Sequence, residues 1–148
     1  LRFVEEGASL AGKRVADMDI ALWTPTSIGR DRALARDHAR GRVASAMRHP
    51  LPVALSAEDE AVVQRLRANY DSFEHATAGS KHRELVPDRF VDLMALAGNP
   101  GEVLEQVRRI REVPEIRRVI ILPQVPGTDF IEREAILRMF AEEVIARV

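Results

Sequence analysis

A short apolar run near the carboxyl end constrains the fold of this chain more than any other feature of its sequence. The run is Arg-Val-Ile-Ile-Leu at residues 118–122, and Pro123 follows it directly. Continuous β-branched residues over so short a length are typical of a strand buried on both faces of a parallel sheet. A second segment of this kind, Met18–Thr24, precedes a stretch at 25–29 whose Pro, Ser and Gly residues predict a loop.

Helix-start signals and helical patterns fill the rest of the sequence. Ser56 and Asn99 are the clearest start signals, because each is a capping residue followed three positions later by an acidic residue. Pro100 strengthens the second signal, since proline favours the first position of a helix. The stretch Glu74–Glu84 has no period and predicts a loop. Apolar spacing predicts helices over Leu1–Leu10, about Arg30–Met47, Ser56–Phe73, Asp88–Leu96, Asn99 to about Glu112, and Phe130–Arg147.

The order of these elements predicts an α/β fold with two parallel strands joined by helical crossovers. Two parallel strands form no stable sheet by themselves, because each keeps an open edge and both faces need cover. The first residues, Leu1–Gly7, include no initiator methionine and read as the middle of a helix. We therefore expect residues 1–148 to be the C-terminal portion of one larger, helix-rich domain.

The composition excludes several classes of partner and site. The net charge is −1, so no strong field is available to hold a nucleic acid or an anionic membrane. No apolar run approaches the roughly 20 residues that a membrane span needs. The chain has no cysteine, which excludes disulfides and Cys-based metal sites and agrees with a cytoplasmic location. No His or acidic cluster has metal-ligand spacing, so we expect no metal.

Three segments resemble luciferase-like monooxygenases and their F420-dependent relatives. Leu85–Asp92 leads into Ala95–Val103, and together they are similar to a segment near the end of these enzymes. Met139–Ile145 resembles the closing helix of the family, and Glu6–Lys13 resembles the approach to an earlier barrel strand. The order and spacing of the segments carry the resemblance more than any one of them. The chain departs from the family pattern at Asn99, Gly101 and Ala146, where Thr, Glu and Pro are usual.

The resemblance implies the C-terminal part of a TIM-type (β/α)8 barrel from a flavin- or deazaflavin-dependent oxidoreductase. With F420 as cofactor, it implies hydride transfer to or from a small organic substrate; with FMN, it implies monooxygenation. Only two of the 22 basic residues are lysines, Lys13 and Lys81, and this arginine-rich composition points to an actinobacterial source and favours F420. We expect a homodimer, as in related barrels, and no activity from these 148 residues alone. The alternative from another class is a non-catalytic helical interaction module.

Ligands of βα barrels meet the loops that follow the strands, which directs attention to two places. After the first strand, Thr24, Thr26 and Ser27 are candidate cofactor-binding residues; the alternative is that they cap the next helix. After the last strand, Gln124 is a candidate for the polar edge of a flavin-like ring, and the alternative is a hydrogen bond to the neighbouring loop. Trp23 is expected in a core rather than stacked on a ring.

The candidate substrate-binding residues are Arg48, His49 and His82. Arg48 and His49 end the long helix, where they either bind an anionic substrate or cofactor tail or satisfy the terminal carbonyls. His82 lies with His75 in the predicted loop, which is either a mobile lid over the site or a solvated loop. The catalytic residues are not assigned.

Overall fold

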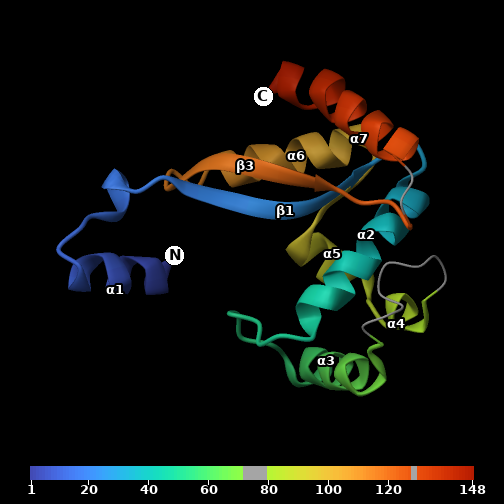
Figure 1. Cartoon of the computed structure of the whole chain (residues 1–148), viewed down its shortest axis with the longest axis horizontal. Coiled ribbons are helices and arrows are strands. Elements are labelled where there is room, and N and C mark those ends of the chain that lie inside the picture. The colour runs from blue at the N-terminus through green and yellow to red at the C-terminus, as the bar shows by residue number, and fades with distance from the viewer. Residues whose placement is uncertain (72–79, 128–129) are drawn as a thin grey trace.

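The computed structural model describes residues 1–71, 80–127 and 130–148. It is an α/β structure built around a parallel sheet (Figure 1). Its elements in chain order are α1 (Arg2–Leu10), η1 (Val15–Asp17), β1 (Ile20–Ile28), α2 (Arg32–Met47), α3 (Ala57–Asn69), α4 (Lys81–Glu84), α5 (Asp88–Met94), β2 (Leu96–Gly98), α6 (Pro100–Arg111), β3 (Ile116–Pro123), α7 (Phe130–Glu143) and η2 (Ile145–Arg147).

The described strands form one parallel sheet in the order β2-β1-β3. Strand β1 pairs with β3 from Ile20 to Thr26 and with β2 from Thr26 to Ile28. The two predicted strands are therefore parallel neighbours, as expected. A (β/α)8 barrel places successive strands side by side, in the order β1-β2-β3. The observed order differs from that expectation, because β1 lies between the other two strands.

Helices cover both faces of the sheet near the carboxyl ends of its strands. Successive residues of β2 show this division, because Leu96 packs in a core with α6 and α7, whereas Ala97 packs in a core with α2, α3 and α5. The chain leaves β1 through α2 on one face and reaches β3 through α6 on the other (Figure 1). The chain thus adds β2 on one side of β1 and β3 on the other side. This change of direction makes β1 a topological switch point.

Strand β1 continues four residues beyond its predicted end at Thr24. The prediction of a loop was wrong for residues 25–28, because β3 pairs with β1 as far as Thr26 and β2 pairs with it from Thr26 to Ile28. Pro25 is tolerated in the strand for a physical reason. The Gln124 backbone N–H donates to the Thr26 carbonyl at 2.8 Å, so Thr26 faces β3 and Pro25 faces the other edge. Pairing with β2 begins only at Thr26, so no ladder donor is needed from Pro25.

The helix starts agree with the sequence signals. The Ser56 hydroxyl accepts from the Asp59 N–H at 3.1 Å, and Asn99 and Glu102 form a complete capping box. Asp31 caps α2 by accepting from the Leu34 N–H at 3.1 Å. Strand β2 was predicted as the end of a helix and the start of a turn, which was wrong. Three residues are too few to give a strand pattern.

The expected loop at Glu74–Glu84 is only partly described. His75 lies outside the described residues, whereas Lys81–Glu84 form helix α4. The solvated-loop prediction is wrong for His82 and Arg83, because both side chains are buried. Each has a specific partner that explains its burial: Ser80 lies beside His82, and Asp37 beside Arg83.

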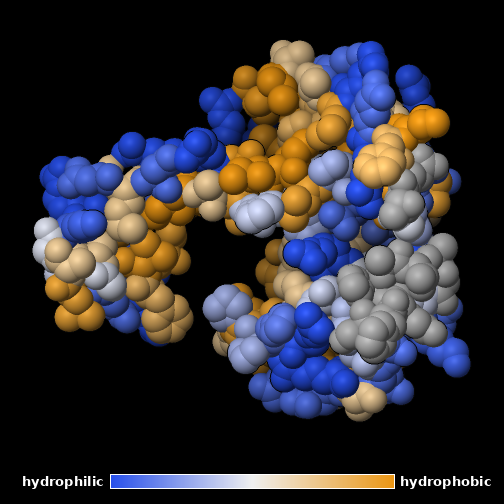
Figure 2. Space-filling model, in the orientation of Figure 1, coloured by the Kyte–Doolittle hydropathy of each residue, from blue (hydrophilic) through white to orange (hydrophobic). Residues whose placement is uncertain are grey.

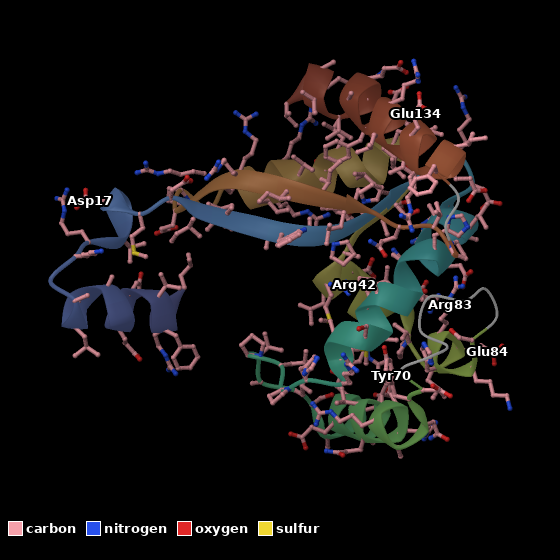
Figure 3. The ribbon with its side chains drawn as sticks, in the orientation of Figure 1. Asp17, Arg42, Tyr70, Arg83, Glu84 and Glu134 are labelled. Carbon is pink, nitrogen blue, oxygen red and sulfur yellow. The ribbon has the colours of Figure 1, made fainter. Side chains whose placement is uncertain are left out.

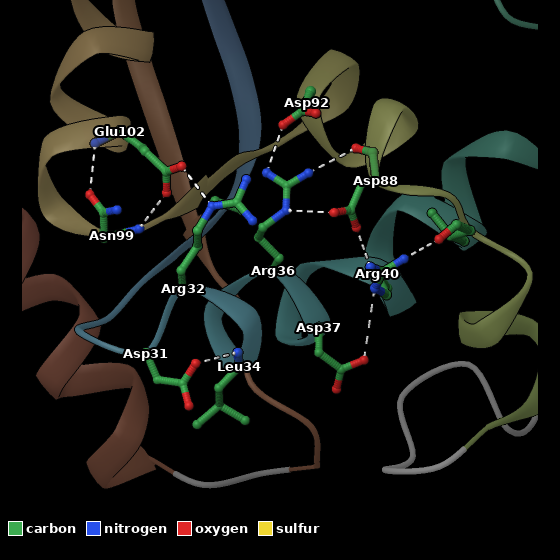
Figure 4. A network of polar contacts seen from close by, with 12 residues as sticks. Asp31, Arg32, Leu34, Arg36, Asp37, Arg40, Asp88, Asp92, Asn99 and Glu102 are labelled. Atoms are coloured by element: carbon green, nitrogen blue, oxygen red, sulfur yellow. Dashed lines mark hydrogen bonds and ion pairs between the residues drawn. The ribbon is translucent and has the colours of Figure 1, made fainter.

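Three arginines on one face of α2 fasten this helix to its neighbours (Figure 4). Arg32 donates to Glu102 of α6 at 2.7 Å, and Arg36 donates to Asp92 of α5 at 2.6 Å. Arg40, one turn further, pairs with the Asp88 carboxylate. The spacing of four places all three on the same side of the helix. They fix α2 against the elements that flank β2.

Helix α1 lies apart from the other helices, beyond the amino end of β1 (Figure 1). Its neighbour in the described structure is η1, which leads into the strand. Figure 2 shows the surface hollowed between α1 and the rest of the molecule, with apolar side chains around the hollow. The large apolar side chains that are exposed on α1, β1 and β3 include Phe3, Leu10, Trp23 and Ile120. None of the described helices is long and apolar enough to cross a membrane.

Candidate functional site

A hollow of about 250 Å³ opens where the carboxyl ends of β1 and β3 meet. Open parallel sheets bind their ligands outside the carboxyl ends of the strands, at a switch point of this kind. The hollow draws residues from both strands, from the segment after β3, and from helices α2, α4 and α7. Its lining residues are Trp23, His38, Gly41, Arg42, Arg83, Leu122, Gln124, Val125, Pro126, Gly127 and Arg133.

Gln124 is the predicted cofactor residue that lines this hollow. Its backbone N–H extends the pairing of β3 with β1, which fixes the position of the residue. Its side-chain Nε2 donates to the Leu122 carbonyl at 3.1 Å, so the amide orientation is set by its own segment. The acceptor lies in β3 and not in the neighbouring loop, which the alternative interpretation of Gln124 required.

Thr24, Thr26 and Ser27 lie in β1 and are buried, rather than in a loop. The Thr26 hydroxyl donates to the Thr24 carbonyl at 3.3 Å, and the Thr24 hydroxyl donates to the Pro25 carbonyl at the same distance. Neither threonine caps α2, because Asp31 has that role. Ser27 lines a second, smaller hollow of about 190 Å³, which shares His38 and Val125 with the first.

Trp23 is 66% exposed, although a core position was expected. It stands on β1 opposite Ile120 of β3 and lines the hollow from the sheet side. Because it is the only tryptophan in the chain, its fluorescence reports on this surface alone. Its ring offers an apolar, aromatic wall beside the polar groups of Gln124 and the helices.

Four basic side chains line the hollow, and no acidic residue is found among its described lining residues. His38 and Arg42 come from one face of α2, Arg83 from α4 and Arg133 from α7. Figure 3 shows Arg42 on the α2 helix below β1 and Arg83 where α4 approaches α2. Arg83 is neutralised by Asp37, whose carboxylate lies 2.6 Å from its guanidinium. Arg133 donates to the Gly127 carbonyl at 2.9 Å, which holds the segment after β3 against α7.

His38 is half-buried between the two hollows. Burial lowers its pKa, because the charged imidazolium loses solvation. Glu132 and Asp37 oppose this change, and Arg83 adds to it. The sequence analysis assigned no role to His38. The sequence feature that could have indicated His38 is its spacing of four residues from Arg42, which puts both residues on one face of the helix.

Arg48, His49 and His82 do not line this hollow. His82 and Arg48 lie instead against the Tyr70 ring, and His49 lies beside Arg48. The His82 ring lies 4.6 Å from the Tyr70 ring, and the Arg48 guanidinium lies 5.2 Å from the same ring. Arg48 also donates to His49 at 3.2 Å. His82 is 1% exposed, so it meets its neighbours rather than solvent.

A parallel sheet with helices on both faces defines the class of the fold as α/β. The model of the luciferase-like monooxygenase family matches residues 1–114. The chain belongs to this family, which confirms the resemblance seen in its sequence. A comparison with curated proteins returned no match.

One solved structure similar to the chain is the coenzyme F420 dependent tetrahydromethanopterin reductase from Methanopyrus kandleri. The two are 22% identical, with a TM-score of 0.61 over 97% of this chain. The matched region is 39% of the reductase, so the chain spans well under half of that protein. At 22% sequence identity, the structural similarity to the reductase establishes the fold of this chain and nothing more.

Proposed function

We propose that the chain is the C-terminal portion of an F420-dependent oxidoreductase that transfers a hydride to or from a small organic substrate. The observation that carries the proposal is the hollow at the carboxyl ends of β1 and β3 in a member of the luciferase-like monooxygenase family. The structurally similar reductase is named as dependent on coenzyme F420, which favours this cofactor. FMN is the alternative, because the family is described as one of monooxygenases.

The residues at the hollow fit part of a flavin-like ring. Trp23 offers an exposed aromatic face, and the Gln124 amide oxygen is available as an acceptor at the polar edge of the ring. The hollow is smaller than the roughly 300–1,000 Å³ typical of whole ligand sites, so it would hold part of the cofactor. The cofactor would supply the hydride chemistry, while Gln124 would orient it and Trp23 would exclude water.

The other proposed cofactor residues contribute differently. Ser27 lines the adjoining hollow, whereas Thr24 and Thr26 bond to the backbone of β1 and would position the strand. For the substrate, we retain Arg48, His49 and His82 as proposed binding residues. The contacts of His82 and Arg48 with Tyr70, and of His49 with Arg48, support a common role, although these residues lie away from the basic hollow.

Binding of the two cofactors tests this proposal directly. The protein is titrated with F420 and with FMN while the fluorescence of Trp23 and of the cofactor is followed. Saturable binding of F420 alone supports the hydride-transfer proposal, and binding of FMN alone supports the alternative. Binding of neither would overturn both.

A substitution at the proposed ring contact sharpens the test. Gln124→Ala removes the amide oxygen and should weaken cofactor binding about fivefold, as expected for one hydrogen bond. The matched control is Gln64→Ala, an exposed glutamine on α3 that lines none of these hollows. An equal loss in both variants would contradict the assignment of Gln124.

Three broader expectations belong to the same proposal. The barrel domain that the family implies would continue outside residues 1–148, and the fold-level likeness to the reductase supports this. A homodimer is supported by the open edges of the sheet and by its exposed apolar residues. A cytoplasmic location is compatible with the absence of cysteine. Sedimentation velocity tests the dimer, since a monomer at all concentrations would contradict it.

A further inference from the structure

The edge of β1 that faces away from β3 is only partly covered. Strand β3 pairs with β1 from Ile20 to Thr26, whereas β2 pairs with it only from Thr26 to Ile28. The Thr26 carbonyl is directed toward β3, so the backbone of Trp23, three residues earlier, is directed toward the other edge. No described strand lies opposite Trp23 on that edge. Its N–H and C=O groups are therefore a template for one more strand.

Apolar side chains from both faces of the sheet surround this open edge. A hollow of about 620 Å³ lies along it, within the roughly 300–1,000 Å³ that is typical of ligand sites. Leu51 and Met94 line it on the side of the α2 and α3 core, and Ile110 lines it on the side of the α6 and α7 core. A hollow of this form suits an extended chain, because successive side chains of a strand point to opposite faces.

The charged and amide side chains of this hollow differ in how fully they are bonded. The Asp92 carboxylate accepts from α2 at 2.6 Å, and the Gln106 side chain bonds to the backbone of Ala97. The Arg109 guanidinium, in contrast, lies 3.9 Å from the Glu105 carboxylate, which is beyond hydrogen-bonding distance. An apolar hollow with an available guanidinium selects an apolar ligand that carries a carboxylate.

The hollow is separate from the other places where the structure can accept a ligand or a strand. Gln106 covers the outer edge of β2, because it accepts from the Ala97 N–H at 3.1 Å. Strand β3, at the other end of the sheet, keeps a free outer edge, so further strands of the same domain would pair there. Among the described lining residues, only Trp23 is shared with the hollow at the strand ends.

We propose that this hollow binds an extended apolar segment of another protein chain, which pairs with the backbone of Trp23 and places an acidic side chain beside Arg109. This is strand addition to an exposed sheet edge. Backbone hydrogen bonds supply the affinity, and the apolar groups on the two sides of the edge select aliphatic side chains. The inference goes beyond the oxidoreductase proposal and does not depend on it.

The first probe is the peptide acetyl-Val-Ile-Val-Glu-amide, titrated into the intact chain while the fluorescence of Trp23 is followed. We expect a saturable blue shift, because the peptide covers an indole ring that is otherwise exposed. Replacing the glutamate of the peptide by glutamine should weaken binding about 3- to 10-fold, as expected for a hydrogen bond to a charged group. N-methylation should reduce binding at the residues whose N–H faces β1 and be tolerated at the alternate residues, because only the first set pairs with the edge.

Two matched pairs of protein variants place the peptide. Arg109→Gln should weaken binding about 3- to 10-fold, and Arg111→Gln, an exposed arginine of the same helix outside the hollow, should not. Val53→Glu puts a charge on the apolar side of the hollow and should weaken binding about tenfold or more. Its control is Val148→Glu outside the hollow, since the two valines are 45% and 43% exposed. Circular dichroism confirms that each variant is folded.

Hydrogen exchange reports on strand pairing itself. Binding of the peptide should slow exchange of the Trp23 amide about tenfold or more, because this N–H gains a partner. The Thr24 amide is the internal control, since it faces β3 and is already paired. Unchanged exchange at Trp23 in the saturated complex would contradict strand addition.

Four further results would overturn the proposal. One is the absence of saturable binding to the unaltered protein, and another is an equal loss in Arg109→Gln and Arg111→Gln, which would show a general effect of net charge. Tolerance of N-methylation at every residue of the peptide would show a site for small apolar acids. A homodimer that Val53→Glu dissociates would show that a second copy of this chain occupies the edge. The titrations with F420 and FMN are independent of all these outcomes.

Discussion

Arg36 illustrates how one buried side chain can connect several elements. Its side chain is 4% exposed, and it donates to Asp92 at 2.6 Å and to the Asp88 carbonyl at 3.0 Å. The hydrogen bond to Asp92 raises the pKa of Arg36, and burial opposes this only in part. The two aspartates lie at the surface, so solvent weakens the ion pairs, but the directed hydrogen bonds are retained.

Arg36→Lys tests whether geometry or charge matters at this position. A lysine ammonium cannot reach Asp92 and the Asp88 carbonyl in the same fork, so we expect a loss of roughly 1–3 kcal/mol in the free energy of unfolding. Urea unfolding measures it. The control is Arg109→Lys, an exposed arginine whose contact with Glu105 is 3.9 Å, where a change below about 0.5 kcal/mol is expected. Equal effects at the two positions would contradict the role of the fork.

His38 predicts a pH dependence of stability. Burial lowers its pKa in the folded chain, so the unfolded chain binds the proton more readily. The stability contributed by the neutral imidazole is complete above the unfolded value of about 6.5 and declines as the pH falls through it. In His38→Gln the free energy of unfolding should fall less between about pH 7.5 and pH 5.5. His49→Gln, an exposed histidine, is the control and should keep the full decline.

At the scale of elements, the start of α6 combines a capping box, which the local sequence predicts, with a tertiary contact to α2. Asn99 and Glu102 exchange hydrogen bonds at 3.0 and 3.1 Å, and Glu102 also accepts from Arg32 of α2. Burial acts to raise the pKa of Glu102, but the hydrogen bonds from Arg32 and the Asn99 backbone outweigh it and lower the pKa. Gly98 precedes this box with a φ of 148°, a conformation that other residues rarely adopt.

Gly98→Ala should therefore destabilise the protein by roughly 1–3 kcal/mol. The added Cβ would meet the Glu102 carboxylate, which is held by Asn99 and Arg32 and cannot move without losing those bonds. Thermal unfolding followed by circular dichroism measures the change. Gly7→Ala, at a helical glycine with open space around it, is the control and should not lower the melting temperature. An unchanged melting temperature in Gly98→Ala would contradict this account.

At the scale of the whole molecule, the sheet order decides which strand ends meet at the hollow. Trp23 and Ile120 are paired across β1 and β3, and both are exposed. In the order β1-β2-β3 a strand would lie between them, which places them roughly 9–10 Å apart. The two arrangements therefore differ in a distance that chemistry can measure.

The double variant Trp23→Cys/Ile120→Cys makes this measurement in a chain with no native cysteine. Neighbouring strands lie within the Cα separation of about 4.4–6.8 Å that a disulfide requires. We expect mild oxidation to form an intramolecular disulfide, detected by mass spectrometry and by mobility in a denaturing gel. The control pair, Trp23→Cys/Ala97→Cys, joins positions outside the β1–β3 pairing and should not cross-link. No cross-link in the first variant would contradict the direct pairing of β1 with β3.

The sequence predicted the features that depend on residues close together in the chain. The capping of α3 and α6 follows from residues three apart, and the two main strands follow from their short apolar runs. Gln124 was predicted as a site residue because it follows a strand directly, and it lines the hollow. The resemblance that marked the family depended likewise on ordered local segments, and it was confirmed.

Only the tertiary structure decided the rest, because those features arise between residues far apart in sequence. Strand β2 is three residues long and exists by pairing with β1, so no local pattern could reveal it. The same pairing draws Ser27 and Ile28 into a strand, beyond the last residue that pairs with β3. The basic hollow is formed when α2, α4 and α7 converge on the strand ends, which brings Arg133 to the same space as Arg42. Periodicity and capping act within a few residues, whereas strand pairing and charge clustering depend on the packed fold.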